Sequence, residues 1–320
     1  MTTQPVPLEP VFEVTSPVSR SLPNATQLVG EFTLQFSSPL KDDDFEELAR
    51  LQAVHPELRL RVYQPGERPP VRDLEFLERL PHLRRFQCEV FALNDFSGLR
   101  HLQRPAFLAL GKTDRSLSLG VLTHLDSLTE LRLEGNRKDI DVIGALRRLE
   151  RLTLRSVTLP DLSVIETLPR LWWLAIKLGG TRDLSAARSL PLKYLEIWQV
   201  RGLADLNFVR ELTQLQYLFL QLLGRVEALP SLARLDQLRR VHLEAIPLGD
   251  LRPLAEAPHL RELLLVAMKQ LDPSSLSVLR GHPTLQAVGY GLGSMRRNDE
   301  ARALLGLPDA AGGAFTFSGE

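Results

Sequence analysis

Leucine and other aliphatic residues recur along this chain in the pattern L-x-x-L-x-L, where x is most often polar. Seven segments match the pattern closely, and they begin at Leu128, Leu149, Leu171, Leu192, Leu215, Leu238 and Leu260. From Leu131 to Leu263, their middle positions are spaced by 21, 22, 21, 23, 23 and 22 residues. Such a regular step indicates that one structural unit of about 22 residues is repeated.

Weaker copies extend the series at both ends, beginning at Leu83 and Pro105 before it and at Leu285 after it. The alternation x-L-x-L-x in each copy predicts a short strand whose leucines point to one side and whose x residues point to the other. One unit cannot bury its own leucines, so the ten units are expected to stack in register and form a parallel sheet.

A second pattern follows several strands, where an aspartate precedes an apolar residue. It is found at Asp95-Phe96, Asp161-Leu162, Asp205-Leu206 and Asp250-Leu251. Together the two patterns resemble the 22-residue leucine-rich repeat of the internalin and SDS22-like type, over about residues 74 to 290. The resemblance implies an α/β leucine-rich-repeat solenoid, with a curved parallel sheet on the concave face and short 3₁₀, helical or loop segments on the convex side. It implies little about function, because this repeat serves many partners.

The turns depart from that family's pattern. The family has Asn three residues after the last strand leucine, and here only Asn136 obeys. The other positions are Phe91, Thr113, Val157, Gly179, Val200, Leu223, Ile246 and Met268. We expect the apolar residues among them to extend the core and make the solenoid less uniform.

The segment before the repeats predicts a cap for the first edge of the sheet. Residues 1–22 are rich in Pro and Ser and are expected to form a flexible arm. Residues 23–72 predict an N-terminal β-α-β cap, with a strand over 30–36, a helix over 42–54 and a strand over 58–62.

The repeats themselves span residues 73–294, in about ten turns. Residues 295–320 are expected to form a C-terminal cap helix, over 299–307, followed by a Gly-rich frayed tail over 310–320.

The strand alternation also shows which residues face outward on the concave face. Aromatic residues gather there on three consecutive strands, at Trp173, Tyr194, Trp198, Tyr217 and Phe219, with Trp172 on the rim. Charged and polar residues on the same or adjoining strands are Arg151, Arg155, Lys177, Glu196, Arg240, His242 and Glu244. An apolar centre with a charged rim is typical of a protein-binding surface.

Two other interpretations of the aromatic residues stay open. The rings can serve structure alone, packed on each other or on a terminal segment that folds back over them. The same face can also mediate self-association, which would make the protein a homo-oligomer.

Composition narrows the classes of partner. The chain has 39 basic and 39 acidic residues, and its outward positions show no stripe of one sign, which argues against nucleic acid. No segment is long and apolar enough for a membrane span or a signal peptide, and the single cysteine fits a reducing compartment. We therefore expect a cytoplasmic protein. An Arg-rich, Lys-poor composition, with 6 Lys among the 39 basic residues, suggests a bacterial source.

Catalytic chemistry is poorly supported. Cys88 occupies an inward strand position, and no pair of histidines has metal-ligand spacing, so we expect no enzyme activity, metal or cofactor. The leading hypothesis is a non-enzymatic module that binds a protein partner, with an inhibitor or immunity-type protein that occludes an enzyme or toxin as one alternative. An alternative from another class is an enzyme or small-ligand receptor that uses Arg240, His242 and Glu244.

Overall fold

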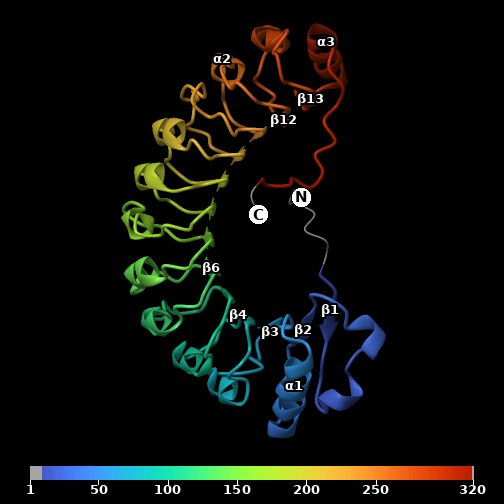
Figure 1. Ribbon diagram of the computed structural model, residues 1–320, viewed down its shortest axis with the longest axis vertical. Helices are drawn as coiled ribbons and strands as arrows, with labels where there is room; N and C mark the ends of the chain where they lie inside the picture. Colours follow the sequence, from blue (N-terminus) through green and yellow to red (C-terminus); the bar gives the residue numbers. More distant parts are fainter. Residues whose placement is uncertain (1–8, 319–320) are drawn as a thin grey trace. The chain divides into compact units, whose positions relative to one another are not determined.

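A computed structural model of the 320-residue chain describes residues 9–318. The described residues divide into two compact units, which meet in sequence between Val157 and Thr158. In each unit short parallel strands follow one another in chain order, and 3₁₀ or α-helical turns lie on the other side of the strands (Figure 1).

The first unit contains seven strands and helix α1 (Asp42–Val54). Its strands are β1 (Val11–Glu13), β2 (Thr33–Phe36), β3 (Arg59–Tyr63), β4 (Arg85–Glu89), β5 (Phe107–Leu110), β6 (Glu130–Glu134) and β7 (Arg151–Arg155). Its 3₁₀ helices are η1 (Val18–Arg20), η2 (Ala25–Gln27), η3 (Glu75–Arg79), η4 (Ser97–His101), η5 (Gly120–His124) and η6 (Ile140–Ala145).

The second unit contains six strands and two α-helices, α2 (Arg252–Ala255) and α3 (Met295–Leu305). Its strands are β8 (Trp173–Lys177), β9 (Tyr194–Trp198), β10 (Tyr217–Gln221), β11 (Arg240–Glu244), β12 (Glu262–Val266) and β13 (Ala287–Tyr290). Its 3₁₀ helices are η7 (Ser163–Ile165), η8 (Ser185–Ser189), η9 (Asn207–Glu211) and η10 (Pro273–Leu279). All ten strands predicted from the repeat are thus present, as β4 to β13.

The core of each unit consists of the inward strand residues and several apolar residues from each turn. Examples that are fully buried are Leu131 and Leu152 in the first unit and Leu174 and Leu218 in the second. Burial of a leucine contributes about 1.5 to 3 kcal/mol, and here neighbouring repeats provide it for one another.

The aspartate turns have a clear physical role. The carboxylate of each aspartate accepts a hydrogen bond from the backbone N–H two residues later, at 2.8 Å for Asp95 and 2.9 Å for Asp161. The same bond is made by Asp183, Asp205, Asp250 and Asp272. At Asp161 the bond from the Ser163 N–H lowers the pKa of the carboxyl, because it stabilises the charged form. The next residue, such as Leu162, is then free to enter the core.

The backbone leaves most strands through a left-handed residue. Gly135 follows β6 with φ 73°, and Ser156, Leu178, Gln199, Leu222, Ala245 and Ala267 hold the same place after β7 to β12 with φ between 51° and 56°. Glycine is the residue that most readily adopts this conformation, but only one of these seven residues is a glycine. The left-handed positions could therefore not be predicted from the sequence.

Asn136 satisfies backbone groups of the turn that follows β5, as expected for the family's asparagine. Its side chain is 1% exposed, donates to the Gly111 carbonyl at 3.0 Å and accepts from the Leu117 N–H at 3.2 Å. At the equivalent places Val157, Val200, Leu223, Ile246 and Met268 are buried, which confirms that apolar residues there extend the core. Phe91 is different, because it is exposed and its neighbour Val90 is buried instead.

The N-terminal segment is more ordered than expected. The β-α-β cap is present as β2, α1 and β3, but residues 9–22 also belong to it. Strand β1 pairs in parallel with β2, Val14 and Val18 are fully buried, and the Val18 N–H donates to the Asp44 carboxylate at 2.7 Å. The flexible arm expected over residues 1–22 is therefore not found in its described part, and residues 1–8 lie outside the described residues.

The C-terminal helix begins four residues before the predicted start, where the Ser294 hydroxyl caps the Arg297 N–H, and it ends at left-handed Gly306. The following residues return to the last strand: the Val288 N–H donates to the Pro308 carbonyl at 3.0 Å, and the Ala310 N–H donates to the Val288 carbonyl at 3.2 Å.

Replacement of Asn136 with Ala tests the buried amide. We expect the free energy of unfolding to fall by about 2 to 3 kcal/mol, because the Leu117 N–H and the Gly111 carbonyl lose their partner inside the protein. Urea denaturation measures the change. The same substitution at exposed Asn94, in the same unit, should change stability by less than about 0.5 kcal/mol. Equal effects at the two sites would contradict this role.

Candidate functional site

Aromatic side chains form a continuous row across β8, β9 and β10, as the sequence predicted. Strand register pairs Trp173 with Tyr194 and Tyr194 with Tyr217. The Trp173 and Tyr194 rings stack with centroids 3.8 Å apart, and Tyr194 meets Tyr217 edge-on at 5.2 Å. Trp172 packs on Trp173 at 5.9 Å, and Phe219 stacks near Tyr217 at 6.5 Å. We call these five residues the aromatic patch.

Trp198 lies apart from this row. It is the last residue of β9, in register with Lys177 of β8 and Gln221 of β10, whereas Tyr194 is the first residue of β9. The Lys177 ammonium lies 5.9 Å from the Trp198 ring centroid. Trp198 is therefore at the other end of β9 from Tyr194.

The C-terminal segment, residues 310–318, covers the aromatic patch. We call it the tail. In Figure 1 it leaves α3 and runs back along the strand side of the second unit. The Phe317 ring packs between Trp172, Trp173 and Tyr194, at centroid distances of 5.4, 5.8 and 6.1 Å. Phe315 packs on Tyr217 at 5.3 Å and on Phe317 at 4.8 Å.

Hydrogen bonds from strand-side residues hold the two ends of the tail. The Gln216 amide accepts from the Ser318 N–H at 2.8 Å and donates to the Ser318 carbonyl at 3.2 Å. The Lys193 ammonium donates to the same carbonyl at 3.0 Å. At the other end, Arg240 donates to the Gly313 carbonyl at 2.8 Å.

Arg240 links the tail to the sheet. Its guanidinium lies 5.3 Å from the Tyr217 ring centroid and 5.1 Å from that of Phe315, and it forms an ion pair with Glu262. The Glu262 carboxylate also accepts from the Gly312 N–H at 3.4 Å. A cation between two rings, neutralised by a carboxylate, stabilises this end of the tail.

The covered patch differs from the open surface that the sequence suggested. Tyr194, Tyr217 and Phe219 are only 2%, 1% and 6% exposed. Of the interpretations left open, a terminal segment folded over the rings is the arrangement observed. The expected frayed tail is not found in its described part, because Phe315 and Phe317 are two residues apart and an extended chain points both to one side. That spacing was visible in the sequence.

The net free energy that holds the tail on the patch is small. Burial of two phenylalanine rings contributes about 1.5 to 3 kcal/mol each, and each hydrogen bond adds about 1 kcal/mol. Ordering of the nine residues costs about 1 to 2 kcal/mol for each of them. The two totals are of similar size, so contacts elsewhere on this face can shift the balance.

Comparisons with known structures identify the fold. An internalin from Listeria monocytogenes matches 91% of this chain and 82% of its own with a TM-score of 0.53, at 18% sequence identity. The chain has the leucine-rich-repeat fold. A second Listeria monocytogenes internalin matches with a TM-score of 0.46 and 23% identity, over 71% of this chain and 84% of its own.

A leucine-rich-repeat protein from Leptospira interrogans matches with a TM-score of 0.44 and 16% identity, over 92% of both chains. No protein-family model matches this leucine-rich-repeat chain, and neither does any curated protein. Among the described residues, no helix combines the length and apolarity needed to cross a bilayer.

The charged residues of the predicted rim have separate environments. Glu196 is 6% exposed, and its carboxylate lies 2.8 Å from the Lys177 ammonium and accepts from the Tyr194 hydroxyl at 3.1 Å. Burial, and then the Glu196 charge, raise the pKa of Tyr194. Arg151 and Arg155 lie on β7 in the other unit, where Arg155 pairs with Glu134 at 3.1 Å, so their place in the rim stays a prediction.

Arg240, His242 and Glu244 do not form a catalytic group. Arg240 is held by the tail and Glu262, and the His242 ring is 2% exposed and stacks on Phe219 at 4.2 Å. His242 Nε2 lies 3.6 Å from the Glu244 carboxylate, which is longer than a hydrogen bond. Both ring nitrogens lack a hydrogen-bond partner among the described residues. Burial, followed by the positive charge of Arg240, lowers the pKa of His242 to about 4.

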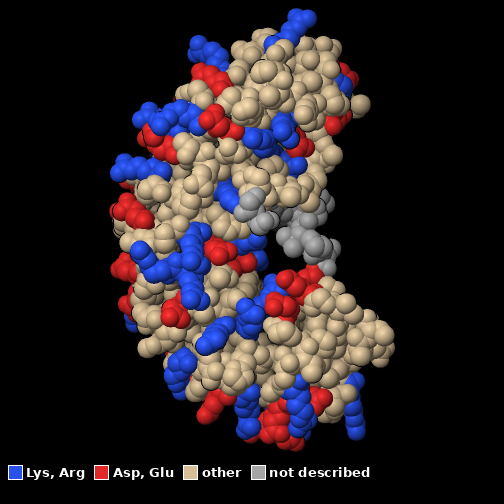
Figure 2. All heavy atoms as spheres, viewed as in Figure 1, with Lys and Arg blue, Asp and Glu red and all other residues tan. Residues whose placement is uncertain are grey.

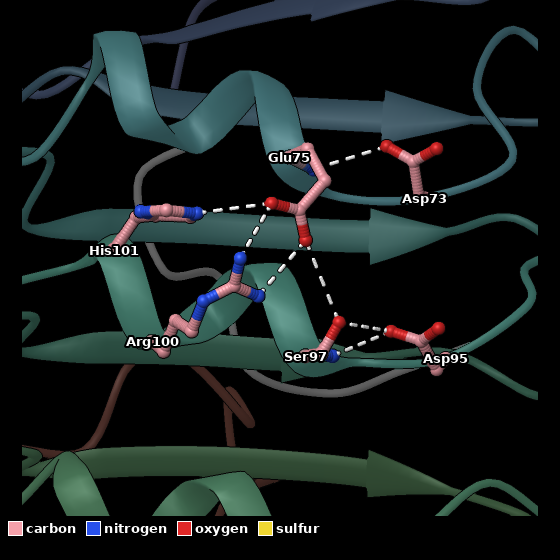
Figure 3. Close-up of polar contacts among 6 residues, drawn as sticks. All are labelled: Asp73, Glu75, Asp95, Ser97, Arg100 and His101. Atoms are coloured by element: carbon pink, nitrogen blue, oxygen red, sulfur yellow. Dashed lines mark hydrogen bonds and ion pairs between the residues drawn. The ribbon is translucent and has the colours of Figure 1, made fainter.

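A polar cluster on η3 and η4, on the turn side of the first unit, contains the residue types of a catalytic triad (Figure 3). Ser97 and His101 do not bond to each other there. Instead, Glu75 binds Arg100 at 2.7 and 2.9 Å and His101 at 3.1 Å, and the Ser97 hydroxyl lies 3.5 Å from the Glu75 carboxylate. These bonds, led by those of Arg100, lower the pKa of Glu75 to about 2. The cluster joins η3 to η4 and activates no nucleophile.

Other chemical candidates are also accounted for. Cys88 is 2% exposed, and burial raises its pKa to about 12, which keeps the thiol protonated. The described residues contain no group of three or more His, Cys, Asp or Glu side chains arranged for a metal ion. A hollow of about 770 Å³ lies on the turn side of the second unit, among residues of η8 and η9, and is remote from the strand residues described above.

Replacement of Phe317 with Ala tests whether the tail covers the patch. Two of the three tryptophans of the chain, Trp172 and Trp173, contact the Phe317 ring, and the third, Trp198, lies on the neighbouring strand β9, so tryptophan emission reports on this region. We expect a shift to longer wavelength and a loss of about 1 to 3 kcal/mol in the free energy of unfolding. The same substitution at exposed Phe91 should leave the emission unchanged. An unshifted spectrum for the Phe317 variant would contradict the packing.

Replacement of His242 with Phe tests the buried imidazole. The unfolded chain binds a proton at this residue below about pH 6.5, whereas the folded chain does so only below about pH 4. Wild-type stability should therefore fall as the pH is lowered from 6.5 to 4, and this part of the fall, up to about 3 kcal/mol, should be missing in the variant. Urea denaturation at several pH values measures it. Parallel curves for the two proteins would contradict the lowered pKa.

Proposed function

We propose that the chain is a protein-binding module and that its binding surface is the strand side of β8 to β11, centred on the aromatic patch. One observation carries this proposal: four aromatic side chains gather on three neighbouring strands, with Trp172 directly before the first of them, outside the leucine core and at positions that are mostly polar in other repeats. Contiguous aromatic surface beyond the needs of a core is typical of interaction sites, and Trp and Tyr are the residues most enriched in binding hot spots.

The charge distribution supports a protein partner over nucleic acid. Basic and acidic residues are equal in number, and they are interspersed over the face of the molecule seen in Figure 2. Near the patch, Lys177 pairs with Glu196 and Arg240 with Glu262, so both of these cations have an anion as a partner. A surface that binds phosphate groups needs an excess of positive charge instead.

Cellular location and role are part of the proposal. A single cysteine, buried in its thiol form, supports a reducing compartment such as the bacterial cytoplasm. An inhibitor that occludes an enzyme or toxin and a scaffold that positions one would both use such a surface, without catalysis of their own. The identity of the partner separates these two roles.

Capture of a partner protein, with this protein as the bait in a lysate of the cells that naturally produce it, tests the proposed surface. Full-length protein with Trp173→Ala should retain a partner at least tenfold more weakly than wild type, because a central ring of the patch is lost. Val278→Ala is the matched control, since this side chain is 40% exposed on η10, in the same unit but on the turn side. The captured protein is then purified and its affinity for both variants measured. Equal affinity for the two variants would place the binding surface elsewhere.

A further inference from the structure

We propose that the tail is a built-in ligand, and that the aromatic patch binds an extended segment of the partner protein with two aromatic side chains two residues apart. This segment takes the place that the tail holds in the free protein. The inference rests on the proposed function, because it specifies what part of the partner the patch recognises.

The tail shows which side chains the patch accepts. Phe317 fills a site with three aromatic walls, Trp172, Trp173 and Tyr194. Phe315 fills a second site between the Tyr217 ring and the Arg240 guanidinium. Residues two apart in an extended chain point to the same side, so one segment with an aromatic-x-aromatic sequence enters both sites at once.

The polar contacts recognise the main chain of the segment. Gln216 binds both the N–H and the carbonyl of Ser318, Lys193 binds that carbonyl again, and Arg240 binds the carbonyl of Gly313. Every peptide carries these atoms. The aromatic sites therefore determine which segment is selected, and the amide and cations determine its direction and extended form.

The way the tail is attached allows exchange. It crosses the strands without adding a strand to the sheet in the part of the chain that the structure describes. Gly312 and Gly313 precede the aromatic residues, and Gly312 is left-handed with φ 59°, so the chain can pivot there. A tethered segment adds a high local concentration to the contacts that it makes. A partner segment that also contacts residues beyond the tail, such as Trp198, overcomes that advantage.

A peptide with the tail's own sequence, GGAFTFS, tests the inference. The full-length variant Phe315→Ala/Phe317→Ala has lost the competing rings and should bind this peptide with a change in tryptophan emission. Wild type, whose patch is occupied, should bind it at least tenfold more weakly. The control peptide GGAATAS should bind neither protein. If destabilisation prevents use of the double variant, Phe317→Ala alone vacates the deeper site and serves the same comparison.

Several results would overturn the inference. A folded double variant that leaves GGAFTFS unbound at millimolar concentration would show that the patch is no peptide site, and equal binding of both peptides would show that the rings are not selected. Concentration-dependent dimers of wild type that the double variant no longer forms would assign the site to the tail of a second copy. A partner captured in a Trp173-dependent way that GGAFTFS does not displace from the double variant would leave the proposed function intact and refute only this inference.

Discussion

The in-register pairing of parallel strands is the constraint on which the rest of this structure depends. A 22-residue repeat holds too few apolar residues to enclose its own leucines, so each repeat is stable only against its neighbours. Once the leucine of one strand lies beside the leucine of the next, the residues between them are aligned as well. Trp173, Tyr194 and Tyr217 meet in one row for this reason, although more than 20 residues separate each from the next.

The same register produces a difficulty that the chain resolves with its own tail. Aromatic rings outside the core would leave apolar surface in water, and Phe315 and Phe317 cover it. The cover contains only two rings and a few hydrogen bonds to side chains, whereas the core beneath it extends through every repeat. The leucine core and the covered aromatic patch therefore lie on the two faces of the same strands, and one can change while the other is kept.

Much of this architecture could be predicted from sequence, because the repeat imposes the same pattern many times. The ten repeat strands and helix α1 follow from leucine spacing and helical periodicity, and the aromatic row follows from alternation within strands. Features that occur only once in the chain were harder to predict from the sequence. Strand β1 consists of three residues among prolines, and its order comes from pairing with β2 and from the Asp44 carboxylate that holds Val18.

The turns and the tail could not be predicted for another reason. Leu178 and Leu222 adopt left-handed conformations that leucine rarely has, because stacking of the repeats outweighs the local preference of one residue. In the tail, the many glycines predict disorder. The two phenylalanines order the tail because they pack on the aromatic patch, and this contact could not be predicted from the tail sequence alone. His242 shows the same limit, since alternation placed it on the correct face but could not reveal its burial.

The segment after α3 performs two tasks that the backbone keeps apart. Pro308 and Ala310 bind Val288 on the last strand, and Gly312 and Gly313 separate these residues from the rings that cover the patch. An unpaired strand at the end of a sheet is a template for aggregation, because its free backbone groups can pair with another chain. The rings can leave the patch while Pro308 and Ala310 stay bound. The proposed exchange of ligands on the patch would therefore leave the last strand shielded from uncontrolled growth into fibres.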